Sequence, residues 1–529
     1  MGHVYLYDTT LRDGAQAEEV NFTATDKISI IRLLDEYRID YIEAGWPYSS
    51  KEDAEVFEKV RSVGLKHAKI SAFGSTHNKN IPAHKDPNLE AIIRSGAEIG
   101  CIFGKTIHEH IKKQLKLSPQ RNLELIFDSV AYLRSKGITV FYDAEHFFDG
   151  FLDDPGYALK CLEKASDAGA RELVLCDTNG GMQPEEVYTI TKEVYEHFRN
   201  RETSKERDNQ DAVSLGIHMH NDGELAVANS LIALDFVDHI QGTINGLGER
   251  CGNANLCSII PNLSLKRSLP VNADVKKTKY VSEMVYTLSN IRPNPKQPFT
   301  GKSAFTHKGG THVDAVLKGA SYEHIDPESV GNVRRILVSK QSGGANIVAM
   351  AAEYGYIIDR KDPRIKAMRE EIEHMDTIGY EIESMPAERF LIAHKHLSGK
   401  KDIFEITGWR ALSEDFENEG SEAVIKGKVG TIEDLVVARV SKEGPVAAIY
   451  DATQKLIRTR YPEIDQVTLK NFKVRIAEDK GQDSKVRTYV EFCNNGDLWG
   501  AAGISRNILK ASMIAVKKGF SYYLNRYCS

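Results

Sequence analysis

Two histidines that are separated by a single residue have a spacing that indicates chemistry. His218 and His220 lie in the apolar run SLGIHMH, which has the character of a β-strand. Residues i and i+2 of a strand project to the same face, so the two imidazoles point together. A structural pair of buried histidines would give the same pattern, and nearby oxygen donors therefore decide between the two interpretations.

Such oxygen donors follow two other apolar runs. Asp13 lies in DTTLRDGAQ, shortly after the run VYLYD, and Asn253 lies in NGLGERCGN, after the run HIQGTI. If these runs are neighbouring strands of a closed barrel, Asp13, Asn253, His218 and His220 converge at one end of it. Imidazole and oxygen donors that leave room for water or substrate suit a catalytic Zn²⁺, Mn²⁺ or Mg²⁺. We therefore predict a divalent-metal site there.

Other polar residues stand where strand-like runs end. Arg12 is either a salt bridge at the rim or a permanent cation that stabilises an enolate or alkoxide. Glu145 ends ITVFYDAE and is either structural or catalytic. Thr178 follows ELVLCD and either makes a turn or hydrogen-bonds a substrate carboxylate. His312, in KGGTH, is either an exposed loop residue or an acid–base group on a mobile lid.

A regular series of strands must position these residues. Helix-period stretches such as DKISIIRLLDEY separate the apolar runs, and this alternation predicts parallel strands with right-handed crossovers. Eight such units are the size of a (β/α)8 barrel, which we predict over residues 1–272. An open doubly wound sheet is the alternative, but no GxGxxG follows the first strand. The eight runs are VYLYD, YIEAG, KISAF, EIGCIF, ITVFYDAE, ELVLCD, SLGIHMH and HIQGTI.

The rest of the chain changes character twice. Residues 273–390 combine an early stretch rich in proline and glycine with the charged helical run RKDPRIKAMREEIEHMD, which predicts helical linker and lid subdomains. In residues 391–529, VTLKNFKVRIAE and KVRTYVEFC flank EDKGQDS as in a β-hairpin. Helices are expected over 444–460 and 505–519, so a β-then-α unit is used twice. We predict an α+β domain there.

Composition excludes several classes of partner. The chain of 529 residues has 69 basic and 75 acidic side chains, a net charge of −6, which disfavours nucleic-acid binding. No apolar stretch is long enough for a membrane span, and the charged start MGHVYLYDTTLRDG is not typical of a secretory signal. Seven scattered cysteines predict reduced thiols. We expect a cytoplasmic protein.

Taken in order, the motifs resemble a known family. DTTLRDGAQ (8–16), HMHND (218–222) and NGLGERCGN (245–253), then FTHKGGTHVDA (305–315), are similar to the 2-isopropylmalate synthase, homocitrate synthase and citramalate synthase family. These enzymes perform Claisen condensations of an acyl-CoA with a 2-oxo acid. GPVAAIYDAT (444–453) and GDLWGAAGIS (496–505) resemble the family's amino-acid-sensing domain. The resemblance therefore covers nearly the whole chain.

The resemblance implies a role for each candidate residue. Asp13, His218, His220 and Asn253 match the family's metal ligands. It implies acetyl-CoA as co-substrate and a homodimer in which the linker acts in cis or in trans. The catalytic base is either Glu145 or a water activated by His312. The further matches are Arg12 for polarising the 2-oxo carbonyl, Thr178 for the substrate carboxylate, Glu145 for the acetyl group, and His312 with Tyr322 as residues contributed by the linker.

Two departures favour the citramalate synthase branch of this family. The chain reads YDAEHFFDG (142–150) where 2-isopropylmalate synthases typically have Ser-Pro-Glu-Asp, and it has IFGKTIHEHI (102–111) after the fourth run. That branch joins acetyl-CoA, pyruvate and water into (R)-citramalate and CoA on a route to isoleucine. Isoleucine is therefore the expected feedback inhibitor.

Three alternatives stay open at this point. The first is a 2-isopropylmalate synthase that uses 2-oxoisovalerate in leucine synthesis. The second is a metal-dependent lyase that cleaves an acyl-CoA on the same barrel, but such lyases end near the end of the barrel, and this chain continues. The third is a non-catalytic amino-acid-binding regulator, which the intact candidate residues disfavour.

Overall fold

The computed structural model describes residues 2–203, 213–320, 322–339, 342–400, 402–414, 420–441, 443–478 and 484–528. Contacts within the chain divide it into two compact units. The first contains Met1–Phe305 and Ile325–Val333, and the second contains Thr306–His324 and Arg334–Ser529. We describe each unit by itself. The predicted boundaries at 272 and 390 stay predictions.

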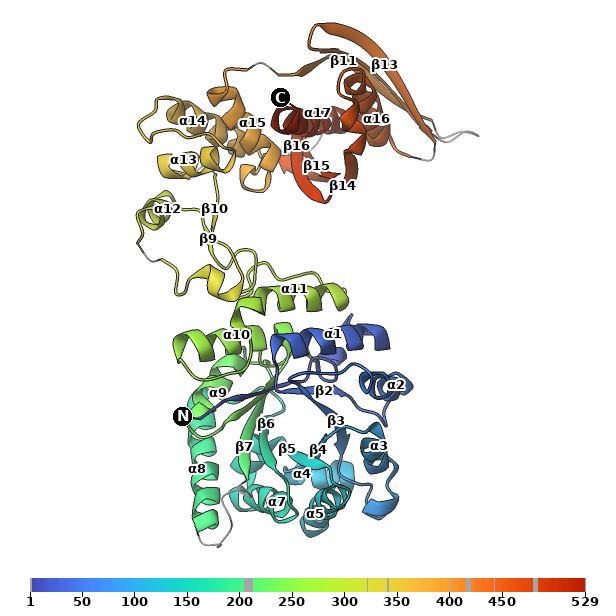
Figure 1. Cartoon of the computed structure of the whole chain (residues 1–529), viewed down its shortest axis with the longest axis vertical. Helices are drawn as coiled ribbons and strands as arrows, with labels where there is room; N and C mark the ends of the chain where they lie inside the picture. The colour runs from blue at the N-terminus through green and yellow to red at the C-terminus, as the bar shows by residue number, and fades with distance from the viewer. Residues whose placement is uncertain are drawn as a thin grey trace. The chain divides into compact units, whose positions relative to one another are not determined.

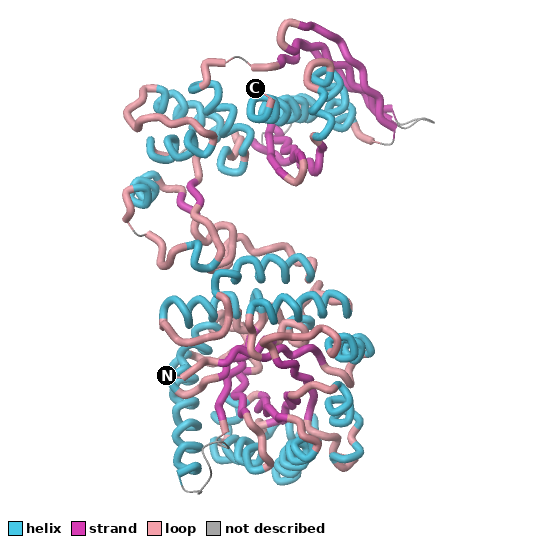
Figure 2. The backbone as a smooth tube through the Cα atoms, in the orientation of Figure 1, coloured by secondary structure: helices cyan, strands magenta, loops and turns pink. Residues whose placement is uncertain are grey.

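The first unit is built around a closed barrel of eight parallel strands, as predicted (Figures 1 and 2). Each strand pairs with the next along the chain, and β8 pairs back with β1, so the open doubly wound alternative is wrong. All eight predicted runs form strands. They are β1 Tyr5–Asp8, β2 Tyr41–Gly45, β3 Lys69–Ser75, β4 Ile99–Lys105, β5 Thr139–Glu145, β6 Glu172–Asp177, β7 Ser214–Met219 and β8 His239–Gly242.

Helices surround the strands, and several begin at a capping side chain. Thr23 and Asp26 form a reciprocal capping box at the first helix, and Asp86 and Asp154 cap two helices that have proline in their first turn. The helices of this unit are α1 Ala24–Tyr37, α2 Lys51–Val60, α3 Pro87–Ser95, α4 His108–His110, α5 Pro119–Ser135, α6 Phe147–Asp153, α7 Pro155–Asp167, α8 Pro184–Thr203, α9 Ala226–Ile232, α10 Leu256–Pro261 and α11 Thr278–Leu288.

The inside of the barrel combines large apolar side chains with buried polar ones. Tyr7, Phe73, Ile99, Cys101 and Phe141 form the interior apolar cluster. Charged and amide side chains share the interior with them, and Glu43, Asp143 and Gln241 are all at most 4% exposed. Because polar groups buried at such depth need partners, they mark the part of the barrel that positions a site.

The second unit holds the linker helices and the C-terminal domain. Its short segments are β9 Thr306–His307 and β10 Arg335–Ile336, which pair in parallel, and the helices α12 Gly310–Leu317, α13 Gly344–Glu353, α14 Arg364–Thr377 and α15 Pro386–Leu397. Helix α14 lies in the charged run for which the sequence predicts a helix. The buried face of this helical part includes Ile347, Met368 and Ile372.

The C-terminal domain repeats one unit, three antiparallel strands followed by a helix (Figure 1). The predicted hairpin of VTLKNFKVRIAE with KVRTYVEFC is correct, although most of its turn, EDKGQDS, lies outside the described residues. The final helix runs past the predicted end at 519, because Phe520, Tyr523 and Leu524 continue its buried face. The elements are β11 Phe404–Glu414, β12 Gly420–Val429, β13 Ile432–Ser441, α16 Pro445–Arg458, β14 Thr468–Glu478, β15 Lys485–Asn494, β16 Asp497–Ser505 and α17 Ile508–Tyr527.

Within the described ranges, none of the helices has the length and apolar character needed to cross a bilayer. All seven cysteines are free thiols.

Candidate active site

The turn after β1 carries Arg12 and Asp13. The backbone N–H of Thr9 donates to the carbonyl of Gly242 at 2.9 Å, which joins this turn to the end of β8. The N–H of Asp13 in turn donates to the carbonyl of Thr9 at 2.9 Å. Closure of the barrel between β8 and β1 therefore sets the position of the Asp13 carboxylate.

Strand β7 and the segment after it carry the two histidines. His218 lies in β7, and His220 follows the strand and forms an isolated β-bridge with Asn253, from the loop after β8. The backbone N–H of His220 also donates to the carbonyl of Asp177, at the end of β6. Side chains from β1, β7 and β8, which are consecutive neighbours in the barrel, are thereby brought to one end of it.

The structure brings Asp13, His218 and His220 together. The Oδ2 atom of Asp13 is 3.3 Å from Nε2 of His218, and this nitrogen is 3.3 Å from Nε2 of His220. One ligand atom from each residue lies within 4.8 Å of the others, and all three residues are buried. A carboxylate and two imidazoles converge here as the sequence spacing predicts.

Burial and the charges of neighbouring groups shift the pKa values of these three side chains. Burial alone would raise the pKa of Asp13, but Arg12 and the hydrogen bond from His218 hold it well below its usual range. Burial opposes protonation of His218, yet the hydrogen bond to Asp13 raises its pKa. Burial and the neighbouring His218 lower the pKa of His220 to about 3. The cluster thus holds one carboxylate and at least one neutral imidazole, which is a donor set suited to a divalent cation.

Asn253 offers a further oxygen beside this cluster. Its Nδ2 atom donates to the carbonyl of Leu247 at 3.0 Å, so the amide orientation is fixed. Its Oδ1 atom is buried without a hydrogen-bond partner among the described residues. A buried amide oxygen left unpaired is costly unless something else accepts its lone pair. The donor set of Asp13, His218, His220 and Asn253 therefore fits a hard or borderline divalent ion.

Arg12 is held rigidly beside the cluster. Its Nε atom is 2.5 Å from Oε1 of Glu43, and its Nη1 atom is 3.2 Å from Oδ2 of Asp13. The guanidinium also stacks over the ring of Phe73, with Cζ 3.8 Å from the ring centre. Burial opposes its charge, but Glu43 and Asp13 raise its pKa above the ordinary value. Arg12 is thus a permanent, oriented cation.

Glu145 and Thr178 lie at the carboxyl ends of β5 and β6. The Oε2 atom of Glu145 is 2.5 Å from Nζ of Lys105, its register partner at the end of β4. The hydroxyl of Thr178 accepts a hydrogen bond from the N–H of His146 at 2.8 Å and retains its own proton to donate. Both are half-buried side chains on the end of the barrel that carries the metal-ligand candidates.

His312 and Tyr322 belong to the second unit. Their rings lie 4.7 Å apart, centre to centre, and Tyr322 is exposed. They form a pair with each other, and their predicted contribution to the barrel stays a prediction.

Sequence reasoning missed several residues that support the site. Glu43 holds Arg12, Lys105 pairs with Glu145, and Gln241 and Asp143 lie behind His218. A usable signal was present, because Glu43, Asp143 and Gln241 interrupt otherwise apolar strands in YIEAG, FYDAE and HIQG. A charged or amide side chain in a buried strand needs a partner, so these positions point to an interior network.

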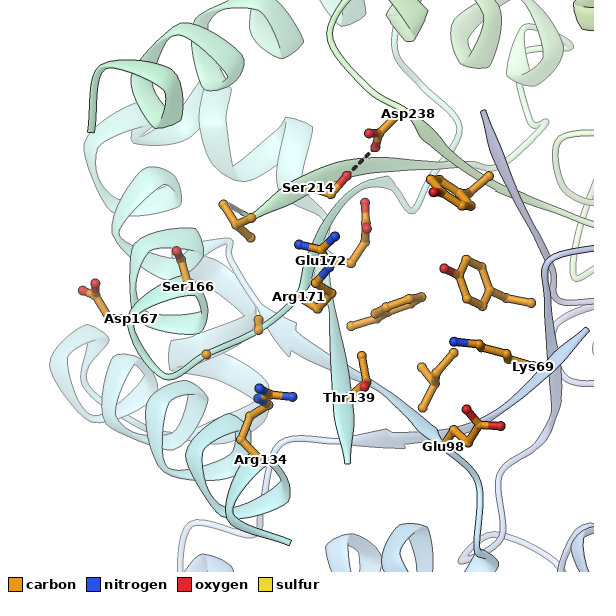
Figure 3. Close-up of a pocket in the computed structure, with 17 residues that line it drawn as sticks. Lys69, Glu98, Arg134, Thr139, Ser166, Asp167, Arg171, Glu172, Ser214 and Asp238 are labelled. Atoms are coloured by element: carbon orange, nitrogen blue, oxygen red, sulfur yellow. Dashed lines mark hydrogen bonds between the residues drawn. The ribbon is translucent and has the colours of Figure 1, made fainter. Parts of the chain in front are cut away.

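A cavity of about 680 Å³ lies at the other end of the barrel (Figure 3). Its lining includes the first residues of β1 to β7, such as Tyr5, Lys69, Thr139 and Glu172. Active sites of such barrels lie at the carboxyl ends of the strands, so this cavity is separate from the candidate site.

Comparison with known proteins agrees with the geometry. A model of the HMGL-like family matches residues 3–285, more than half of the chain. The chain is 43% identical to the (R)-citramalate synthase of Geobacter sulfurreducens, over 99% of this chain and 98% of that protein. It is 41% identical to the (R)-citramalate synthase of Sulfolobus acidocaldarius, over 98% of this chain and 97% of that protein. The chain belongs to the (R)-citramalate synthase family.

The parts beyond the barrel fit this family too. Models described as "Homocitrate synthase post-HMGL domain-like" and "LeuA allosteric (dimerisation) domain" match residues 299–379 and 383–524. The 2-isopropylmalate synthase of Methanocaldococcus jannaschii is more distant, at 29% identity over 98% of this chain and 95% of that protein. HMGL-like proteins depend on a divalent metal, and this chain has an Asp–His–His cluster suited to one.

Proposed function

We propose that this protein condenses acetyl-CoA with pyruvate and water to give (R)-citramalate and CoA. The observation that carries the proposal is the near-full-length identity of 41–43% to several (R)-citramalate synthases, against 29% to 2-isopropylmalate synthases. The Asp13, His218 and His220 cluster supports it, because a carbon–carbon bond to a ketone needs electrophilic activation.

Asp13, His218, His220 and Asn253 are the residues we propose to hold a divalent ion. Bound there, the ion would act as a Lewis acid on the keto and carboxylate oxygens of pyruvate. The unpaired Oδ1 of Asn253 and the short distances within the cluster support this assignment. A carboxylate, two imidazoles and an amide oxygen suit Mn²⁺, Mg²⁺ or Zn²⁺, and we choose Mn²⁺ as the probe in the experiments below.

Arg12 is the residue we propose to stabilise negative charge on the former keto oxygen. Glu43 and Asp13 keep its guanidinium charged and fixed in place, so little reorganisation is needed as charge develops. Thr178 would donate its remaining hydroxyl proton to the pyruvate carboxylate. Glu145 would act at the acetyl methyl group, and Lys105 would hold the Glu145 carboxylate in place. His312 and Tyr322 are proposed to complete the site from the linker.

Acetyl-CoA is proposed to bind next to Glu145. A cavity of about 530 Å³ at the carboxyl ends of β3 and β4 supports this, because Lys105 is part of its wall. Lys79 lies on the same wall and would neutralise negative charge on the CoA phosphates. Such a local cation is needed because the net charge of the chain is −6 and gives no overall positive field. Trp46 and Phe103 offer apolar surface for the pantetheine arm.

Isoleucine is the effector we propose for the C-terminal domain. The match to an allosteric domain over residues 383–524 supports regulation there, and a cavity of about 630 Å³ within it has aliphatic walls. Val446, Leu469 and Ile508 contribute those walls, and Asp451 lies at the same cavity. Calorimetry on the intact protein tests this directly. Binding of neither isoleucine nor leucine would overturn the sensing role.

A homodimer is the proposed assembly. The matched domain is described as a dimerisation domain, and β13 exposes apolar side chains on one face that a second copy would cover. Leu435 and Val437 are two residues apart and so share this face of the strand, and they are 58% and 48% exposed. The proposed location is the cytoplasm, in keeping with the seven free cysteines.

Release of CoA thiol from acetyl-CoA tests the proposed reaction. Pyruvate, 2-oxoisovalerate and 2-oxoglutarate are compared with Mn²⁺ present, and again after chelation. We expect turnover with pyruvate that chelation abolishes. A preference for 2-oxoisovalerate would favour the 2-isopropylmalate synthase alternative, whereas no condensation with any of the three would overturn the proposal.

A further inference from the structure

A chain of two hydrogen bonds runs from His218 into the wall of the barrel. The Nδ1 atom of His218 lies 2.8 Å from Oε1 of Gln241, in β8. The Nε2 atom of Gln241 donates to Oδ1 of Asp143, in β5, at 3.1 Å. Asp143, His218 and Gln241 are 4%, 5% and 0% exposed, so water has little access to compete for these bonds.

The direction of each bond follows from donor and acceptor chemistry. The Oδ1 atom of Asp143 accepts from the NH₂ group of Gln241, and this bond holds the orientation in which that NH₂ group faces Asp143. The amide oxygen of Gln241 then faces His218, so Nδ1 of His218 carries a proton and donates it to this oxygen. The other ring nitrogen, Nε2, faces Asp13 and His220, and once it gives up the proton that it donates to Asp13, its lone pair can bind a cation.

We propose that Gln241 is a positioning residue that fixes the tautomer and ring orientation of His218, and that Asp143 fixes the orientation of Gln241. The inference rests on the metal site of the proposed function. Partners of this kind behind a ligating histidine typically change metal affinity by about 10–100-fold when they are lost.

The first test is Mn²⁺ binding to the full-length protein, measured by the loss of the free-ion electron paramagnetic resonance signal. Gln241→Met keeps the length of the side chain but removes both hydrogen bonds. We expect the dissociation constant for Mn²⁺ to rise by about 10–100-fold. Gln297→Met is the matched control, because Gln297 is a buried glutamine of the same unit that bonds Tyr286 and Thr300. It should leave Mn²⁺ affinity unchanged.

The second test addresses Asp143 by exchanging acceptor and donor. Gln241→Glu places two carboxylates against each other, so we expect weaker Mn²⁺ binding. Asp143→Asn in the same chain supplies an NH₂ donor to Glu at position 241, whose other oxygen accepts from His218. The double variant should recover most of the lost affinity, and recovery through a changed partner is not expected of a merely structural role.

The outcomes separate this inference from the proposed function. If the wild-type protein binds no Mn²⁺, the proposed metal site itself fails. If it binds Mn²⁺ and Gln241→Met binds it equally well, only the positioning role of Gln241 fails. If Gln241→Glu binds normally, or Asp143→Asn brings no recovery, the role of Asp143 is overturned.

Discussion

Replacing Glu43 with glutamine removes the negative charge that the Arg12 guanidinium faces inside the barrel. Glu43 is fully buried, and only 12% of the Arg12 side chain is exposed. Glu43 accepts hydrogen bonds from Nε of Arg12 at 2.5 Å and from the hydroxyl of Tyr7 at 2.7 Å. Glutamine keeps the shape and one acceptor, so the substitution tests the charge rather than the packing.

The expected loss follows from these contacts. Removing one partner of a buried ion pair costs about 3–5 kcal/mol, because the other charge stays buried. The retained amide oxygen can still accept from Arg12, and such a bond to a charged group contributes about 1.5 kcal/mol. Asp13, with its carboxylate 3.2 Å from Nη1 of Arg12, offsets part of the remainder. We therefore expect Glu43→Gln to lower the free energy of unfolding of the barrel by about 1–3 kcal/mol.

Unfolding of the barrel can be followed separately from the second unit. Trp46 is the only tryptophan in the first unit, and it packs against Phe73 and Phe103 close to Arg12. Urea unfolding followed by fluorescence, with Trp409 and Trp499 replaced by phenylalanine in every protein compared, reports on the barrel alone. This matters because a chain of two units need not unfold in one step.

Glu58→Gln is the matched control for this prediction. Glu58 is an exposed glutamate on α2, and its replacement should change stability by less than about 0.5 kcal/mol. A loss below about 1 kcal/mol for Glu43→Gln would refute the reasoning, because it would mean that Arg12 does not depend on this carboxylate.

Three further predictions concern other parts of the chain. Burial raises the pKa of Asp8 from 3.8 to about 7, so the folded state binds its proton more tightly than the unfolded state, and stability falls as the pH rises from about 4 to about 7. Asp8→Asn should flatten this part of the urea-unfolding profile, and an unchanged slope would contradict the assignment. Lys105→Met leaves Glu145 without its cation and should lower kcat/KM for acetyl-CoA by about tenfold. An unchanged kcat/KM for acetyl-CoA would argue against a role for the Lys105–Glu145 ion pair in the reaction. Leu435→Lys places a charge on the exposed face of β13 and should halve the mass measured by light scattering, whereas an unchanged dimer would place the interface elsewhere.

The barrel was predictable from the sequence because its strands are short apolar runs separated by amphipathic helices. All eight runs form strands, and the strand-end positions of Asp13, His218 and His220 sufficed to expect their convergence. When eight parallel strands close into a barrel, the eighth strand lies next to the first, so segments far apart in the chain become neighbours.

Contacts that depend on register were beyond the sequence. Lys105 and Glu145 are partners across β4 and β5, but the sequence pattern ends the fourth strand before Lys105. The hydrogen bonds of Gln241 and Asp143 likewise depend on side chains that cross the barrel interior from strands far apart in the chain. Hydrophobic periodicity predicts strands and faces, and it carries no information on which polar interior side chains meet.

The end of the last helix was missed for a different reason. The stretch after 519 mixes aromatic side chains with Ser521, Asn525 and Arg526, and aromatic residues, serine and asparagine have only modest helix propensity. In the structure this stretch is buried among the C-terminal strands and helices, where such a composition is favourable.

The central claim is the reaction, and the product formed by the full-length protein tests it most directly. Acetyl-CoA, isotope-labelled pyruvate and Mn²⁺ are incubated with the protein, and the product is identified by chiral chromatography and mass spectrometry. We expect labelled (R)-citramalate in amounts equal to the CoA released. Absence of citramalate, or a kcat/KM for 2-oxoisovalerate above that for pyruvate, would contradict the account.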